Sequence, residues 1–454
     1  MKMIFEKCGG AAESFWNSRC YTPLLLILAS VGHITKLNLP CMFLLVAVTV
    51  FMLIFSDDLM SVICPLFMIL LESIRYYKDY SQLAPYMWYA IIPFAAAALF
   101  NLIYYRKPWK RGHFTLPLAA VSIALLLGGV GYISAKDWSS AVSLYYMLGL
   151  GAAALYIYQL SLSRLENVRS YDRVQRLAEA IYAAGLLCVV IVIVFYARNI
   201  DAIIKNGGVI FFKARNYLSS VLLIAIPMPC LFIKRSNWHI AGMASMLAAA
   251  VTVGSRSGLL FAPIVCAVSA LYIFIKHPEH RKLYTVLALI VLIPAAAVAI
   301  AILPDLFASR IAEGGGFISG NETRVKFIRQ GIQDFLNHPI NGVGVGNTKN
   351  VELFPGIITG SLVFYHNIVI QVFASMGLIG AAAYGWNFAA RLKMLWVNRR
   401  SELFVFAFSY FGILLMSLTN PGMFCPFPEV GLFAIIFALI EKESEKPGVR
   451  QKSS

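Results

Sequence analysis

Runs of about 18 or more apolar residues recur from one end of this chain to the other. A helix of that length crosses a hydrocarbon core about 30 Å thick. A buried core helix is an alternative for any single run, but so many runs in series leave little room for it. The pattern predicts about 12–14 transmembrane helices, with the first and third segments the weakest. They lie near 22–36, 40–55, 59–75, 86–105, 114–133, 139–162, 177–197, 217–233, 238–253, 257–275, 283–303, 362–390, 403–419 and 427–441.

Lysine and arginine determine the expected orientation of these segments. With the N-terminus inside and strict alternation, most of the 38 basic residues fall in cytoplasmic segments, as the positive-inside rule requires. Both termini are then cytoplasmic, and the one long loop, 304–361, lies outside. We expect N-terminal transmembrane helices in 1–200, a core with that loop in 201–442, and a cytoplasmic tail in 443–454.

Composition agrees with a multi-pass membrane protein. The chain is 59% hydrophobic and 13% charged, with a mean hydropathy of +0.74, which excludes a soluble globular protein. The net charge of +16 is explained by basic cytoplasmic loops, so a nucleic-acid partner is not expected. The eight cysteines form no CxxC pair and indicate neither a zinc site nor a disulfide framework, and no cleavable signal peptide is evident.

The long loop contains the polar stretch "GNETRVKFIRQGIQDFLNHPINGVGVGN", residues 320–347. Its apolar residues recur at helical spacing, and Asn321 is suitably placed for an N-cap. We therefore predict a short amphipathic helix across the outer mouth of the helix bundle. The Pro- and Gly-rich "HPINGVGVGN" predicts a tight turn back towards the membrane, and the alternation requires no re-entrant segment.

On this topology Arg215, Arg256, Arg324, Arg329 and His366 share the outer side. Each has a simpler interpretation: Arg256 can snorkel to the interface, Arg215 can be an ordinary loop base, and the other arginines can face solvent. A lone histidine at a helix start is commonly satisfied by local hydrogen bonds. Together, however, guanidinium groups that bind phosphate and an imidazole that accepts a proton suit an anionic lipid headgroup beside a reactive centre.

The sequence lacks the common motifs for nucleotide phosphates and for catalytic metal ions. The chain contains no GxxxxGK[ST] phosphate loop and no HExxH metal motif, and the glycines of "GVGVGN" follow no strand. We expect no metal ion and no cofactor.

Three blocks, "VTVGSRSGLLFAP", the loop stretch above and "YHNIVIQVFASMGLIGAAAYG", occur in that order. Over roughly residues 215 to 420 they resemble the bacterial O-antigen ligase and polymerase superfamily. The resemblance implies an inverting, metal-independent transfer in an all-α fold like that of type-C glycosyltransferases. Arg256 and Arg324 would contact a lipid-linked diphosphate, Arg215 resembles an upstream basic position of the family, and His366 would activate the acceptor hydroxyl. Arg329 is a further diphosphate-binding candidate because it lies in the same polar stretch as Arg324.

Three functions fit these residues. The first is a polymerase that joins undecaprenyl-diphosphate-linked repeat units on the outer face of the bacterial cytoplasmic membrane. The second is a ligase that moves the finished glycan to another acceptor glycan or lipid, such as a lipid A core. The third is a transporter of the lipid-linked glycan, although no internal repeat between the halves supports it. A chain-length regulator is a further candidate partner.

Overall fold

The computed structural model describes residues 2–76, 80–130, 148–165, 173–201, 214–277, 281, 317–345, 365–420, 422–424 and 429–445. The chain divides into two compact units, and each is described here by itself. Unit 1 contains residues 1–109 and 163–276, and unit 2 contains residues 110–162 and 277–454. The expected division at residue 200 into N-terminal spans and a core stays a prediction, and each compact unit contains helices from both of these parts.

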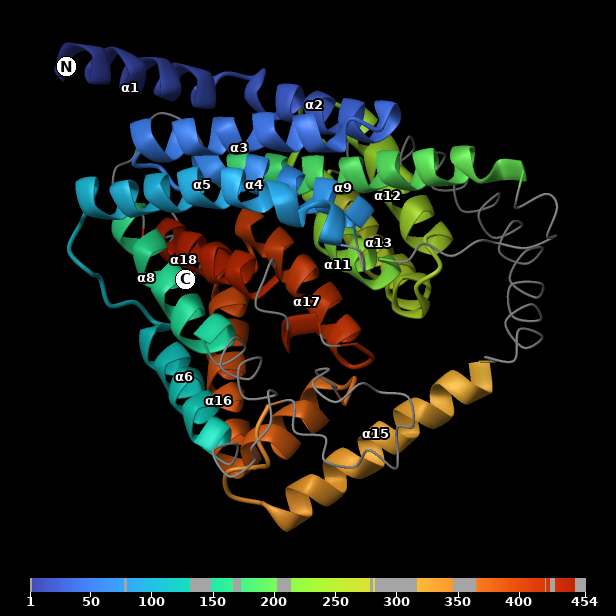
Figure 1. Ribbon diagram of the computed structural model, residues 1–454. Helices are drawn as coiled ribbons and strands as arrows, with labels where there is room; N and C mark the ends of the chain where they lie inside the picture. Colours follow the sequence, from blue (N-terminus) through green and yellow to red (C-terminus); the bar gives the residue numbers. More distant parts are fainter. Residues whose placement is uncertain are drawn as a thin grey trace. The chain divides into compact units, whose positions relative to one another are not determined.

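The described residues form helices, and no strand occurs among them (Figure 1). Unit 1 begins with α1, a helix that the apolar pattern did not predict. Its helices are α1 (Lys2–Asn17), α2 (Tyr21–Thr35), α3 (Asn38–Phe55), α4 (Met60–Glu72), α5 (Ala84–Tyr104), α9 (Arg173–Arg198), α11 (Arg215–Ala225), α12 (Trp238–Thr252) and α13 (Arg256–Lys276). Short 3-10 turns extend α4 (Ser73–Tyr76), precede α5 (Tyr80–Gln82) and follow α11 (Met228–Leu231).

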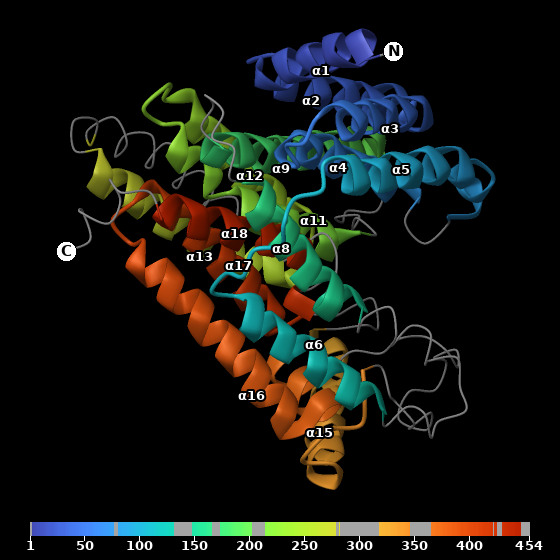
Figure 2. The ribbon, with the colours of Figure 1, turned by 90° about the vertical axis from the view of Figure 1, so that its left-hand side faces the viewer.

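Unit 2 is built around α16, the longest described helix, with α6 packed along it (Figure 2). Its helices are α6 (Thr115–Val130), a π-helical turn (Leu148–Ala153) that leads into α8 (Ala154–Arg164, which crosses the boundary with unit 1), α15 (Phe317–Asn337), α16 (Ile368–Val397), α17 (Val405–Ser417) and α18 (Gly431–Ser444). Short 3-10 turns lie at Glu402–Phe404 and Gly422–Phe424.

These helices confirm the all-α, multi-pass membrane class. Five described helices, α3, α5, α9, α13 and α16, are long and apolar enough to cross a membrane, and five shorter apolar segments accompany them. Every predicted span with described residues contains a helix. The span expected at 283–303 and part of the one at 139–162 lie outside the described residues.

Buried polar contacts join helix ends in unit 1 that the predicted alternation places on one side. Asn38, at the start of α3, donates to Glu72 Oε2 at the end of α4 over 2.5 Å. Arg198, at the end of α9, donates to the carbonyl oxygen of His33 near the end of α2 over 2.7 Å. At the other ends, Asn101 of α5 donates to backbone carbonyl groups at the end of α3. The contacts agree with alternating helices, while the side that faces the cytoplasm stays a prediction.

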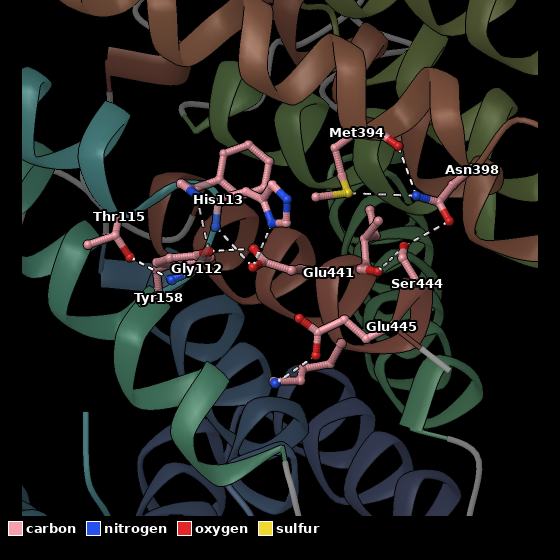
Figure 3. A network of polar contacts seen from close by, with 12 residues as sticks. Gly112, His113, Thr115, Tyr158, Met394, Asn398, Glu441, Ser444 and Glu445 are labelled. Atoms are coloured by element: carbon pink, nitrogen blue, oxygen red, sulfur yellow. Dashed lines mark hydrogen bonds and ion pairs between the residues drawn. The ribbon is translucent and has the colours of Figure 1, made fainter. Parts of the chain in front are cut away.

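One end of unit 2 is held by the buried carboxylate of Glu441 in α18 (Figure 3). It accepts from the Tyr158 hydroxyl over 2.5 Å and from the His113 backbone N–H over 2.9 Å, and His113 Nδ1 lies 3.0 Å from it. A Cβ at Gly112 would overlap the Tyr158 hydroxyl, so only glycine fits there. This network ties α18 to α8 and to the start of α6, three ends that the alternation places together.

The helix α16 is broken inside its span, at Gly377, where φ is 60° and ψ is −152°. Residues 338–345 lie along the break and replace the missing helical hydrogen bonds. Val343 N donates to Ala374 O (2.8 Å), Gly344 N to Ser375 O (2.9 Å), Leu378 N to Pro339 O (2.8 Å) and Ile379 N to Ile340 O (3.2 Å). A Cβ at Gly342 would overlap the backbone of α16, which explains the glycine there.

The break lies nine residues after Ile368, about 13 Å along the helix. Non-helical backbone at membrane depth must find its partners within the protein, and here the two irregular segments satisfy each other. The turn predicted for "HPINGVGVGN" is present, with Gly342 N donating to His338 O over 2.9 Å, whereas the break in α16 beside it was not predicted. Irregular backbone pairing has no sequence period, so the apolar pattern did not reveal it.

Candidate active site

Two predicted arginines lie together in unit 1, each at the first residue of a helix. Arg215 begins α11 and Arg256 begins α13, and these two helices pack against each other. The Ser255 hydroxyl donates to Asn216 Oδ1 over 3.0 Å, which links the residues beside the two arginines. The guanidinium groups are near enough to repel each other. Unit 1 therefore holds a concentrated positive charge at two helix N-termini, an arrangement that attracts phosphate.

The conformation of the "VGSRSG" stretch places Arg256 at the first residue of α13. Gly254 has φ 79°, a left-handed conformation that turns the chain from α12 into α13. Ser255 Oγ accepts from the Gly258 N–H over 3.4 Å and so caps the new helix. A Cβ at Gly258 would lie 2.5 Å from Ser219 Oγ, so this glycine allows α13 to approach α11 closely.

His366 lies in unit 2, two residues before α16 begins. The span was expected to start at 362, and the later helix start leaves His366 outside the helix. Asn367 is the N-cap, and its side chain accepts from the N–H groups of Val369 and Ile370. His366 itself has φ 55°, a left-handed conformation that few residues other than glycine adopt. The backbone thus turns sharply at the imidazole and presents it at the helix end.

The amphipathic helix α15 brings Arg324 to this histidine. The Phe327 ring packs against the imidazole with centroids 5.5 Å apart. Burial, together with the positive charge of Arg324, lowers the pKa of His366 to about 4. His366 Nδ1 is buried and has no hydrogen-bond partner among the described residues. The imidazole is therefore uncharged at neutral pH.

The predicted helix starts earlier than expected. α15 begins at Phe317, so Asn321 lies inside the helix and is not its N-cap. The helix is present, but its buried face is not the predicted apolar one: Phe327 and Gly331 are buried, whereas the apolar Val325 and Ile332 are exposed together with Arg329. Arg324 and Phe327 are three residues apart and share a face, whereas Arg329 lies on the other face and does not join His366.

The structure thus forms two pairs, each within one unit: Arg215 with Arg256, and Arg324 with His366. Sequence reasoning missed Tyr365, Asp334 and Gln371, which hold the backbone at His366 through hydrogen bonds. The helical spacing of Arg324, Phe327 and Asp334 was the available signal. Among the residues the structure describes, no group of three or more His, Cys, Asp or Glu side chains forms a metal site.

The fold defines an all-α, multi-pass membrane protein with an arginine pair in unit 1 and an arginine beside a neutral histidine in unit 2. Residues 241–385 match the family model described as O-Antigen ligase. This match supports the resemblance to the O-antigen ligase and polymerase superfamily over that part of the chain. The matched region contains Arg256, Arg324, Arg329 and His366 and leaves Arg215 outside. No curated protein and no solved structure matches the chain, so the likeness to type-C glycosyltransferases stays a prediction.

Proposed function

We propose that this protein is an integral membrane glycosyltransferase that uses an undecaprenyl-diphosphate-linked oligosaccharide as donor. It transfers the oligosaccharide to an acceptor hydroxyl on the outer face of the bacterial cytoplasmic membrane. The observation that carries the proposal is the neutral, buried His366 beside Arg324, inside the region that matches the family. The product is surface polysaccharide of the O-antigen or capsule type.

In the proposed reaction the acceptor oxygen attacks the anomeric carbon and the bond to the diphosphate breaks with inversion. His366 takes the proton of the acceptor hydroxyl, and the diphosphate leaves with the bonding electron pair. Arg324 binds the diphosphate beside His366. For Arg256 the same role rests on the family resemblance, and Arg215 adds positive charge beside it within unit 1. Arg329 stays a weaker predicted contact, because its side chain lies on the exposed face of α15.

Donor binding would also improve His366 as a base. The positive charge of Arg324 is one cause of the low pKa of His366, after burial. A diphosphate bound to Arg324 offsets that charge, so the pKa of His366 rises towards the range where a general base is most effective. The base would thus gain strength when the donor is present.

We favour a polymerase, because no feature for a lipopolysaccharide core was recognised in the sequence. A ligase is the second candidate, and the family description names ligation. The two share the donor chemistry and differ in the acceptor. A chain-length regulator would be a partner of the polymerase only.

The test uses purified protein in nanodiscs with a synthetic undecaprenyl-diphosphate oligosaccharide, without nucleotide or added metal. A ladder of growing chains from the wild type, absent with His366→Ala, is the expected result for a polymerase. Product that forms only after a separate lipid acceptor is added identifies a ligase. If neither forms and the lipid-linked unit instead crosses the membrane, the protein is a transporter and the proposal fails.

A further inference from the structure

The backbone at His366 is held in an unfavourable conformation by its neighbours. A left-handed φ on a residue with a side chain is strained and persists only when the surroundings enforce it. On one side, Asn367 caps α16 and donates through Nδ2 to the Leu418 carbonyl oxygen over 3.2 Å. This contact fixes the residue after His366.

On the other side, Tyr365 is held at both its ends. Its backbone N–H donates to Gln371 Oε1 over 3.0 Å, within the first turn of α16. Its hydroxyl donates to Asp334 Oδ2 over 2.6 Å, and Asp334 belongs to α15. Gln330 holds the other carboxylate oxygen of Asp334 at 2.8 Å. The Tyr365 side chain is therefore a bridge from the histidine segment to the helix that carries Arg324.

Helix α15 packs closely against the start of α16 and against Tyr365. A Cβ at Gly331 would overlap Ile370 and would lie 2.9 Å from Cδ1 of Tyr365. Arg324, Phe327 and Asp334 follow one another at intervals of three and seven residues, so they face α16 together. Residues 338–345, which follow α15, also pair with the backbone of α16, so the C-terminal end of α15 is anchored to α16.

We propose that Tyr365 and Asp334 are positioning residues for the transfer, which set the distance and angle between the His366 imidazole and the Arg324 guanidinium. The inference rests on the proposed function. Neither residue touches the reacting atoms in this scheme. They act through His366, because a catalytic group displaced by about 1 Å loses much of its effectiveness, on the order of a hundredfold.

The test is Tyr365→Phe in the nanodisc transfer assay, with the pH profile of kcat and the folded fraction measured together. This substitution removes one hydroxyl and changes no charge. We expect kcat per folded protein to fall by about tenfold with KM nearly unchanged. We also expect the acidic limb to move to higher pH, because a loosened imidazole is better solvated and its pKa rises.

The matched control is Tyr158→Phe. Tyr158 is another buried tyrosine of unit 2, 0% exposed against 1% for Tyr365, and its hydroxyl likewise donates to a carboxylate, that of Glu441. Its loss lowers stability without moving kcat or the acidic limb. If Tyr365→Phe behaves in the same way, the Tyr365 hydrogen bond is structural only and the inference is wrong.

A second pair of variants covers the case in which Tyr365→Phe does not fold. Asp334→Asn keeps an acceptor oxygen for the tyrosine and should retain most of the rate, whereas Asp334→Ala should lose about as much as Tyr365→Phe. Equal rates for the two Asp334 variants would contradict the inference. Wild-type activity in His366→Ala would instead contradict the proposed function, so the two failures are distinct.

Discussion

The two ends of unit 2 use the same kinds of polar side chain for different results. At the Glu441 end, the carboxylate receives three polar contacts, from the Tyr158 hydroxyl and from two nitrogens of His113. At the His366 end, a buried imidazole nitrogen has no partner among the described residues, and its backbone is left-handed. Satisfied polar groups stabilise a helix bundle, whereas strain and an unpaired acceptor beside a cation are typical of chemistry.

The largest expected effect comes from replacing, in turn, the histidine at each of the two ends. His366→Ala removes the general base, so the transfer rate should fall by about a hundredfold to ten-thousandfold. His113→Ala should leave the rate per folded protein unchanged, since its imidazole serves the Glu441 network. Initial rates with the lipid-linked oligosaccharide measure both, and comparable losses would show that the two ends do not differ in this way.

The second-largest effect on the transfer rate is expected from substitutions on the two faces of α15. Arg324→Ala removes the charge that would bind the diphosphate, and the rate should fall by about a hundredfold. Arg329→Ala, on the exposed face, should change it by less than about threefold, as for a solvated charge. The measurement is the rate at saturating donor together with KM for the donor. A larger loss in Arg329→Ala than in Arg324→Ala would overturn the assignment.

A smaller effect concerns pH. The base must be neutral to accept a proton, and burial together with Arg324 lowers the pKa of His366 to about 4. Acidification should therefore leave kcat/KM, which reports the free enzyme, intact through pH 6 and reduce it only near pH 4. Arg324→Gln removes the repelling charge, so the pKa of His366 rises and the residual activity should be lost at a higher pH. An acidic limb near pH 6.5 in the wild type would contradict this environment.

The smallest effect on the reaction is expected at the Glu441 end. Gly112→Ala places a methyl group against the Tyr158 hydroxyl and should destabilise the protein by about 1–3 kcal/mol, as overpacking does. The midpoint of thermal unfolding in nanodiscs should fall, while the rate per folded protein stays the same. A selective loss of activity without a change in stability would assign this network to the reaction as well.

Sequence alone predicted the membrane class, the helical segments, the helix of the long loop and a set of candidate arginines with one histidine. Those features follow from periodicity, length and charge, which are local properties of the chain. The break at Gly377 was not predictable, because its backbone partners lie more than thirty residues earlier in residues 338–345. The environment of His366 was not predictable either, because it depends on contacts across distant segments.

Arg324 and Arg329 also show which features follow from the sequence and which follow from packing. By residue type and spacing both were diphosphate candidates, and only the packing of α15 against α16 separated the face towards His366 from the exposed face. The hydrogen bond from Tyr365 to Asp334 spans 31 residues and is likewise a product of that packing. The sequence thus determined which residue types and helices are present, while tertiary structure decided which side chains meet, because burial and distance arise only when the helices pack.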